Sequence, residues 1–306
     1  FPVTSYMGRV RSYVYAVDGV SFSLNKKSTF GLVGETGCGK TTTGRTLMRL
    51  IEPTSGSAVY QGRDIFKMSS AEFLKIRRNL AMIFQDPYSS LNPKQRVGSI
   101  IEEPMKIHKL YNKAERAEKA LELLYKVGLD EEQFFRYPHE FSGGQRQRIG
   151  IARALAANPE IIICDEPVSA LDVSIQSQVI NLLEDLQDQF DLGYIFIAHD
   201  LSVVRHISDN IGVMYLGSLV EQAETDELFT KPLHPYTKAL LSAIPVPNPF
   251  YKRSRIKLEG GLPSLRNLPK GCKFSTRCTW VMEKCREMVP EYREVSPGHF
   301  VACHLI

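Results

Sequence analysis

The chain has 306 residues, of which 43% are hydrophobic, and this length predicts one main domain with a modest additional segment. Its 38 basic and 34 acidic residues give a formal net charge of +4, a balance that does not indicate a nucleic-acid partner. No apolar run approaches the roughly 20 residues that a membrane-spanning helix needs, and no secretory signal pattern is found. We therefore expect neither a membrane span nor a signal peptide in this sequence.

Strand-like and helix-like segments alternate along the chain. Runs rich in apolar and β-branched residues predict strands at 28–33, 80–85, 160–164 and 194–198. Helical patterns are predicted at 41–50, at 113–127 before the stop signal Gly128, and at 142–157. Because strand signals fade between Gln85 and Pro159, we expect a helical subdomain at about 86–159. The pattern predicts an α/β fold with a mostly parallel core sheet.

The composition changes near residue 244. Prolines recur from Pro245 to Pro269 and interrupt regular structure. We therefore predict a main domain at 1–244, followed by a Pro-rich and loop-rich C-terminal extension at 245–306.

A glycine-rich segment follows the first predicted strand. Residues 34–41 read Gly-Glu-Thr-Gly-Cys-Gly-Lys-Thr and fit the phosphate-binding pattern of Gly, four residues and Gly-Lys-Ser/Thr. The glycines let backbone N–H groups converge on phosphate, Lys40 adds positive charge, and Thr41 offers a hydroxyl to Mg²⁺. The strand before it and the helix after it argue against a chance glycine-rich turn. The predicted nucleotide-binding residues are Gly34, Glu35, Thr36, Gly37, Cys38, Gly39, Lys40, Thr41 and Thr42.

Two adjacent carboxylates end the third predicted strand. In a P-loop fold Asp165 lies at the end of this strand, near Mg²⁺. Glu166 follows, and a carboxylate there can orient and deprotonate the attacking water. The alternative, an acidic surface turn after a buried strand, loses weight once the phosphate-binding loop is present. These residues predict a P-loop nucleotidase.

A further motif narrows the class. Residues 141–148 read Phe-Ser-Gly-Gly-Gln-Arg-Gln-Arg and open a helix, with Ser142 as the N-cap. The start of such a helix favours anions, and it stands 20 residues before the strand's acidic end. Residues 141–145 resemble the LSGGQ signature of the ABC ATPase family, with Phe141 in place of Leu.

Other motifs of that family follow in order over residues 1 to about 244. Gln85 resembles the Q-loop glutamine, residues 169–172 the D-loop ending at Asp172, and His199 the switch histidine. The resemblance implies that two ATPase domains enclose two ATP molecules, so that each signature contacts the partner's nucleotide. It assigns that role in trans to Ser142, Gly143, Gly144 and Gln145. It assigns Mg²⁺ to Thr41, Gln85 and Asp165, catalysis to Glu166 and His199, and adenine stacking to Phe1, with Tyr13 and Tyr15 as alternatives.

Two further segments, at 84–93 and 232–237, resemble the oligopeptide and dipeptide permease ATPases. This resemblance implies a peripheral subunit at the cytoplasmic face of the inner membrane. Its implied partners are a second ATPase subunit, identical or different, two transmembrane permease subunits and an extracytoplasmic substrate-binding protein. Related importers carry nickel, glutathione or sugars, and these stay as alternatives. A soluble ABC ATPase and a regulatory module that binds ATP without hydrolysing it are further alternatives.

Four of the six cysteines lie in the last 35 residues: Cys272, Cys278, Cys285 and Cys303. Four thiolates can hold a structural zinc ion or an iron–sulfur cluster. Zinc sites commonly use cysteine pairs two to four residues apart, which this tail lacks. The resemblance implies a four-iron four-sulfur (4Fe-4S) cluster, with zinc and unliganded thiols as alternatives.

Overall fold

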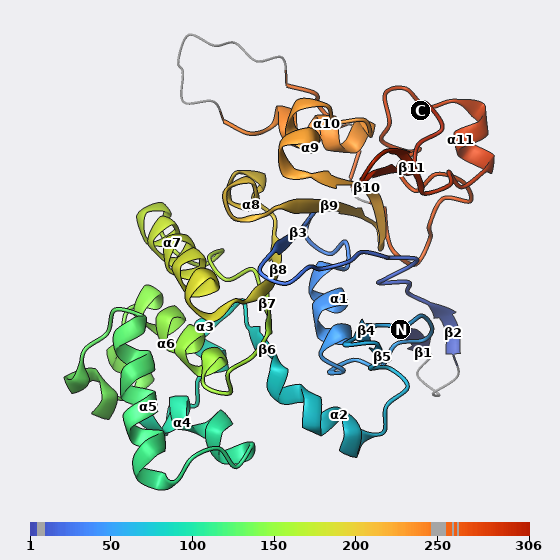
Figure 1. Cartoon of the computed structure of the whole chain (residues 1–306). Coiled ribbons are helices and arrows are strands. Elements are labelled where there is room, and N and C mark those ends of the chain that lie inside the picture. The colour runs from blue at the N-terminus through green and yellow to red at the C-terminus, as the bar shows by residue number, and fades with distance from the viewer. Residues whose placement is uncertain (5–9, 246–254, 259, 262) are drawn as a thin grey trace. The chain divides into compact units, whose positions relative to one another are not determined.

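The computed structural model describes residues 1–4, 10–245, 255–258, 260–261 and 263–306 (Figure 1). The chain forms two compact units, each built from separate stretches of sequence. Unit 1 contains Phe1–Ser23, Phe30–Thr43 and Ala198–Ile306, and unit 2 contains Leu24–Thr29 and Gly44–Ile197. The domain boundary predicted at residue 244 adjoins 246–254, which lie outside the described residues. The described part of the C-terminal extension belongs to the same unit as the glycine-rich loop.

Three parallel strands form the main sheet of unit 2. They are β6 (Leu80–Ile83), β7 (Ile161–Asp165) and β8 (Gly193–Ala198), with β7 in the middle. Every residue of β8 is buried, which explains why the strand reads as a continuous apolar run instead of an alternating one. All three strands lie where the sequence predicts them.

Helices fill the chain between β6 and β7, as the fading strand signal predicts. They are α3 (Pro87–Ser90), α4 (Val97–Ile107), α5 (Lys113–Lys126), η2 (Glu131–Phe135), η3 (Pro138–Glu140) and α6 (Gly143–Leu155). Asn112 is the N-cap of α5 and forms a capping box with Glu115, in which each side chain accepts the backbone N–H of the other residue. Helix α6 packs against α3, α4 and α5, and also against α7 (Val173–Phe190), a long helix that the sequence analysis did not predict.

Five strands form the main sheet of unit 1. Strand β3 (Thr29–Val33) pairs in parallel with β9 (Asn210–Tyr215), and β10 (Ser218–Glu224) pairs antiparallel with β9. Strands β12 (His299–Val301) and β11 (Arg293–Ser296) continue the sheet from β10. The extension therefore contributes strands, although the sequence predicts mainly loops. These strands are too short for a periodic pattern, and long-range pairing with β10 forms them.

The remaining elements are small. Unit 1 also holds β1 (Pro2–Thr4), β2 (Val10–Tyr13), α8 (Leu201–Ile207), α9 (Thr225–Thr230), α10 (Pro235–Ser242) and α11 (Glu283–Glu287). Unit 2 also holds β4 (Val59–Tyr60), β5 (Arg63–Asp64), α2 (Ser70–Ile76) and η1 (Arg77–Asn79), and α1 (Lys40–Leu47) begins in unit 1 and ends in unit 2. Within the part of the chain that is described, no helix has the length and apolar character to cross a membrane.

Candidate functional site

The glycine-rich loop leaves the fully buried strand β3 and enters α1. Gly34, Gly37 and Gly39 have φ values of 153°, 83° and 108°, a region that favours glycine. A Cβ atom at Gly34 would lie 2.2 Å from the carbonyl oxygen of Met214, and one at Gly39 would lie 2.0 Å from that of Ala16. The backbone conformation therefore favours glycine at all three positions. At Gly34 and Gly39 the close approach of other backbone atoms of the same chain also leaves no room for a side chain.

Lys40 lies over this loop. Its Nζ donates to the carbonyl oxygens of Gly34 at 2.7 Å and Glu35 at 3.2 Å, and the residue is 4% exposed. Thr36 and Gly37, at the crest of the loop, are exposed. The ammonium group is thus fixed among the loop's backbone atoms while the crest stays open to a ligand, as phosphate binding requires.

The side chains of Cys38, in the glycine-rich loop, and Cys164, in β7, are both buried. Burial raises the pKa of the Cys38 thiol above its usual range, and burial also raises that of Cys164 within β7. Thiols with raised pKa values are poor nucleophiles and poor metal ligands. The carbonyl oxygen of Cys38 accepts the N–H of Gly217 at 2.9 Å, so this residue helps to fix the loop against the β9–β10 turn.

Glu35 has contacts that sequence reasoning missed. Its N–H donates to the hydroxyl of Tyr236 at 3.0 Å, and its carboxylate accepts hydrogen bonds from Arg277. Tyr236 lies in the 232–237 segment, which resembles the oligopeptide and dipeptide permease ATPases. No local pattern indicates Arg277, because 242 residues separate it from Glu35.

The three candidates for adenine stacking lie close to one another, because the chain around Phe1 pairs with the chain around Val14. Phe1 exchanges backbone hydrogen bonds with Val14, so it is paired between Tyr13 and Tyr15. The three aromatic residues are 54%, 55% and 55% exposed. All three are accessible to a ligand, and the geometry does not choose among them.

In unit 2 the structure brings Gln85 and Glu166 together. Asp165 ends β7 and is fully buried, and Glu166 follows with a φ of 46°. Its N–H donates to the carbonyl oxygen of Ile197 at 2.9 Å, and its Oε2 accepts the Nε2–H of Gln85 at 2.8 Å. A non-glycine residue in this conformation is uncommon and often occurs at functional sites. The backbone therefore holds the Glu166 carboxylate in a defined place at the end of the strand.

The signature segment forms an exposed helix start. Ser142 caps α6 through a capping box with Gln145, with hydrogen bonds of 3.3 and 3.0 Å. Ser142 and Gly143 are exposed, whereas Phe141 is 5% exposed. The residue that replaces leucine in the motif is thus a core residue, and its apolar character is what the fold uses.

The D-loop and the switch histidine are both accessible. Asp172 is exposed at the N-terminus of α7, and His199 is exposed after β8. Gln176, which sequence reasoning missed, donates from Nε2 to the carbonyl oxygens of Val168 at 3.1 Å and Leu171 at 2.9 Å. This side chain fixes the D-loop backbone against the first turn of α7.

The four tail cysteines are free thiols. The Cys272 N–H donates to the carbonyl oxygen of Cys285 at 2.8 Å. Burial, followed by the charges of Cys285, Cys303 and Cys278, raises the pKa of Cys272 to about 11. The thiols are thus near enough to influence one another, but among the described residues no group of three or more His, Cys, Asp or Glu side chains is placed to hold a metal ion. The structure does not support the predicted metal site.

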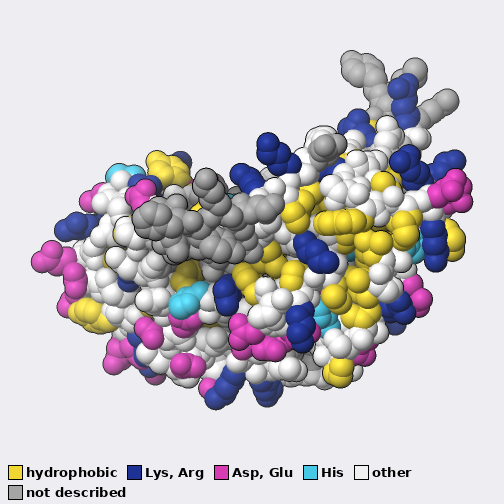
Figure 2. All heavy atoms as spheres, turned by 90° about the horizontal axis from the view of Figure 1, so that it is seen from above, with side chains coloured by type: hydrophobic (Ala, Val, Ile, Leu, Met, Phe, Trp, Pro, Cys, Tyr) yellow, Lys and Arg dark blue, Asp and Glu magenta, His cyan; other side chains and the backbone are white. Residues whose placement is uncertain are grey.

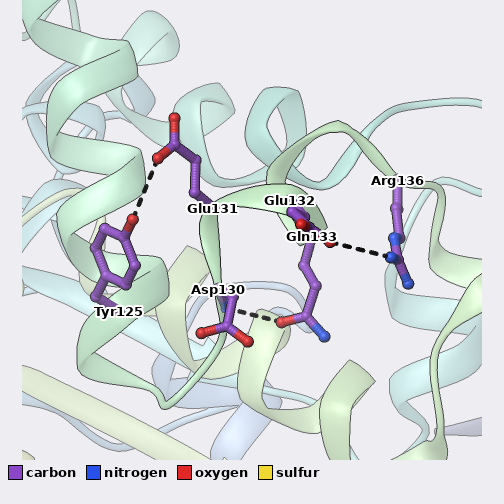
Figure 3. A pocket seen from close by; sticks show the side chains of 6 residues that line it. All are labelled: Tyr125, Asp130, Glu131, Glu132, Gln133 and Arg136. Carbon is purple, nitrogen blue, oxygen red and sulfur yellow. Dashed lines mark hydrogen bonds and ion pairs between the residues drawn. The ribbon is translucent and has the colours of Figure 1, made fainter.

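A hollow of about 410 Å³ opens in the helical part of unit 2 (Figure 3). It is lined by Tyr125, Asp130, Glu131, Glu132, Gln133 and Arg136. None of these belongs to the motifs above, and its many carboxylates do not suit a nucleotide.

Comparison with known proteins identifies the family. A model described as "ABC transporter" matches residues 17–169, and one described as "Oligopeptide/dipeptide transporter, C-terminal region" matches 220–285. The oligopeptide transport ATP-binding protein AppF of Bacillus subtilis is 58% identical, covering 100% of this chain and 94% of the relative. The dipeptide transport ATP-binding protein DppF of Escherichia coli is 49% identical, covering 100% and 91%.

Solved structures agree in fold. The ATP-binding cassette MJ0796, solved as a dimer bound to ADP and phosphate, is 29% identical with a TM-score of 0.63, over 69% of this chain and 91% of that one. CbiO1 of Clostridium perfringens gives a TM-score of 0.64 at 24% identity, over 75% and 88%, which concerns the fold alone. The α/β P-loop fold predicted from the sequence is confirmed, and the chain belongs to the ABC transporter family of ATP-binding proteins.

Proposed function

We propose that this chain hydrolyses ATP to energise the import of dipeptides or oligopeptides through partner membrane subunits. Relatives named for oligopeptide and dipeptide transport match over its full length. The chain also matches the C-terminal region named for such transporters. Nickel, glutathione and sugar import remain alternatives without a specific observation in their favour. The proposal places the chain at the cytoplasmic face of the membrane as a peripheral subunit.

The hydrogen bond between Gln85 and Glu166 carries the proposal for hydrolysis. Glu166 acts as general base on the attacking water, and Gln85 holds its carboxylate at 2.8 Å. Because the amide nitrogen of Gln85 is engaged by Glu166, its oxygen is left to face a cation. The hydroxyl of Thr41, this amide oxygen and the carboxylate of Asp165 are hard oxygen donors of the kind Mg²⁺ prefers.

The nucleotide itself is assigned to residues 34–42. Backbone N–H groups of the loop surround the phosphates, Lys40 neutralises their charge, and His199 contacts the γ-phosphate or the water. Most of the catalysis is electrostatic and positional. Adenine is assigned to Phe1, with Tyr13 and Tyr15 as alternatives.

The signature helix is assigned to the nucleotide of a partner ATPase subunit. The exposure of Ser142 and Gly143 at a helix start supports this role, because such a start attracts phosphate. The proposed complex contains this dimer, two permease subunits and an extracytoplasmic binding protein. In a homodimer, mixing Ser142→Arg and Lys40→Ala chains should restore part of the activity, since one composite site then keeps both intact residues. A verified mixed dimer without rescue would refute sharing between subunits.

The tail cysteines are assigned to a 4Fe-4S cluster with a bracing role. The Cys272 thiol interacts electrostatically with the three other tail thiols, and four thiolates are the donor set of such a cluster. Among the described residues, however, their arrangement is not that of a finished metal site. Protein purified without oxygen should be brown and should contain equal amounts of iron and acid-labile sulfide. Cys285→Ser should lose both. Stoichiometric zinc without iron, or no metal at all, would refute the cluster.

The transport proposal is tested in vesicles that contain the complex purified with its own permease subunits. Uptake of labelled di- and oligopeptides should require ATP inside the cytoplasmic compartment and should be absent with Lys40→Ala. Uptake of nickel, glutathione or sugar in place of peptides would refute the peptide assignment and leave the ATPase role intact.

A further inference from the structure

The C-terminal extension reaches the glycine-rich loop through the segment 272–278. Arg277 Nη1 donates to both carboxylate oxygens of Glu35, at 3.0 and 2.8 Å. The arginine side chain is 9% exposed and the glutamate side chain 27%. An ion pair that is largely shielded from water contributes more stabilising free energy than an ordinary surface ion pair, because solvent screens it less.

Two further contacts fix this segment in unit 1. Lys273 Nζ donates to Asp18 Oδ2 at 2.8 Å and to the carbonyl oxygen of Leu216 at 3.0 Å. Phe274 is 2% exposed and packs against Tyr215 and Tyr236, with ring centroids 5.2 and 5.4 Å apart. Arg277 therefore projects from a rigid support.

The same cluster holds Glu35 by its backbone. The Tyr236 hydroxyl accepts the Glu35 N–H at 3.0 Å, and Lys40 Nζ donates to the Glu35 carbonyl oxygen at 3.2 Å. Glu35 is the second residue of the loop, so an unneutralised carboxylate there would repel an incoming triphosphate. Arg277 neutralises that charge and fixes the side chain of Glu35.

We propose that Arg277 is a positioning residue for the nucleotide loop, and that through its bond to Glu35 the C-terminal extension sets the affinity for ATP. This inference rests on the proposed role of residues 34–42 in binding ATP. It makes the extension part of the ATP-binding apparatus and assigns the 272–278 segment a task besides any bracing by its cysteines.

The test is Arg277→Gln in the full chain. The Kd for Mg-ATP, measured by displacement of a fluorescent nucleotide, should rise about tenfold, the effect of losing one charge-assisted interaction. In the assembled transporter the KM for ATP should rise by a similar factor while kcat stays within about twofold. Arg277→Lys keeps the charge and should recover part of the affinity. The exposed Arg286 lies in the same extension, and Arg286→Gln should leave the Kd unchanged.

A double variant separates charge from general structure. In a double-mutant cycle, Arg277→Gln introduced into Glu35→Gln should change the Kd by less than about threefold, because the carboxylate that Arg277 neutralises is already absent. A Kd within twofold of wild type in Arg277→Gln would overturn the inference. So would a loss of kcat and folded protein at unchanged KM, or an equal effect of Arg277→Gln on the Kd in the wild-type and Glu35→Gln backgrounds. A wild-type chain that fails to bind ATP would instead refute the proposed nucleotide site.

Discussion

Glu221 should be the strongest single anchor of the C-terminal extension. This carboxylate is fully buried in β10. It accepts the N–H groups of Leu233 at 2.7 Å and His234 at 2.9 Å, and it pairs with Nε2 of His299 at 2.9 Å. His299 belongs to β12, so one side chain joins the extension, the β10 strand and the start of α10.

Replacing Glu221 by leucine keeps the approximate volume but removes the acceptor of two backbone N–H groups and the partner of Nε2 of the buried His299. Removing one partner of such a buried network costs about 3–5 kcal/mol. For a chain of 306 residues that corresponds to a fall in Tm of roughly 5–8 °C. Thermal and urea unfolding of the purified subunit measure the loss, and limited proteolysis should cut the extension first.

Glu224→Gln is the matched control, because Glu224 lies at the end of the same strand and is exposed. Its effect should stay within about 0.5 kcal/mol. If Glu221→Leu lost less than about 1 kcal/mol, or no more than the control, the anchoring role would be wrong.

Two more predictions concern a buried histidine and a closely packed glycine. His234 is 1% exposed, and burial, with a smaller effect from the Lys238 charge, lowers its pKa to about 3 from 6.5. Its contribution to stability is therefore complete above pH 6.5 and is lost as the pH falls toward 3, by at most about 1.4 kcal/mol per pH unit. His234→Asn keeps an acceptor for the Tyr236 N–H and should flatten urea-derived stability between about pH 6.5 and 4.5; an unchanged slope would refute this. Separately, Gly144→Ala should destabilise by about 1–3 kcal/mol because its Cβ would lie 2.5 Å from Cγ2 of Ile175, whereas Gly143→Ala meets its nearest atom at an ordinary 3.5 Å. Equal unfolding free energies for these two alanine variants would contradict the close approach.

The sheet strands with continuous apolar runs were predictable because burial on both faces leaves a strong local signal. Ile161, Ile162 and Ile163 in β7 are such a run. The start of α6 was equally predictable, since Ser142 and Gln145 form a capping box readable from sequence. Helix α7 was missed although its buried positions, such as Val179, follow helical spacing.

The contacts of the extension were not predictable from local patterns. The bond of Arg277 to Glu35 and the pairing of His299 with Glu221 join residues 242 and 78 positions apart. Such pairs depend on which strand lies beside β10, and no periodicity or spacing in the tail specifies that partner. The nucleotide motifs, in contrast, are contiguous in sequence because each lies at the end of one strand or the start of one helix.

Figure 2 shows hydrophobic side chains gathered on one side of the face it displays. Among the described residues of the extension, the exposed large hydrophobic side chains are Trp280, Met282, Met288, Val289, Leu305 and Ile306. These apolar side chains therefore contribute little to the packing of the extension. Polar contacts such as that between Glu221 and His299 anchor it instead.

Glu166, whose carboxylate accepts a hydrogen bond from Gln85, is the proposed base for ATP hydrolysis. The most direct measurement is the steady-state ATPase rate of Glu166→Gln in the assembled transporter, together with its affinity for ATP. The amide is nearly isosteric but cannot accept the proton of water, so turnover should fall at least about a hundredfold while ATP still binds and holds the dimer closed. A rate near that of the wild type, at full ATP occupancy, would contradict the account.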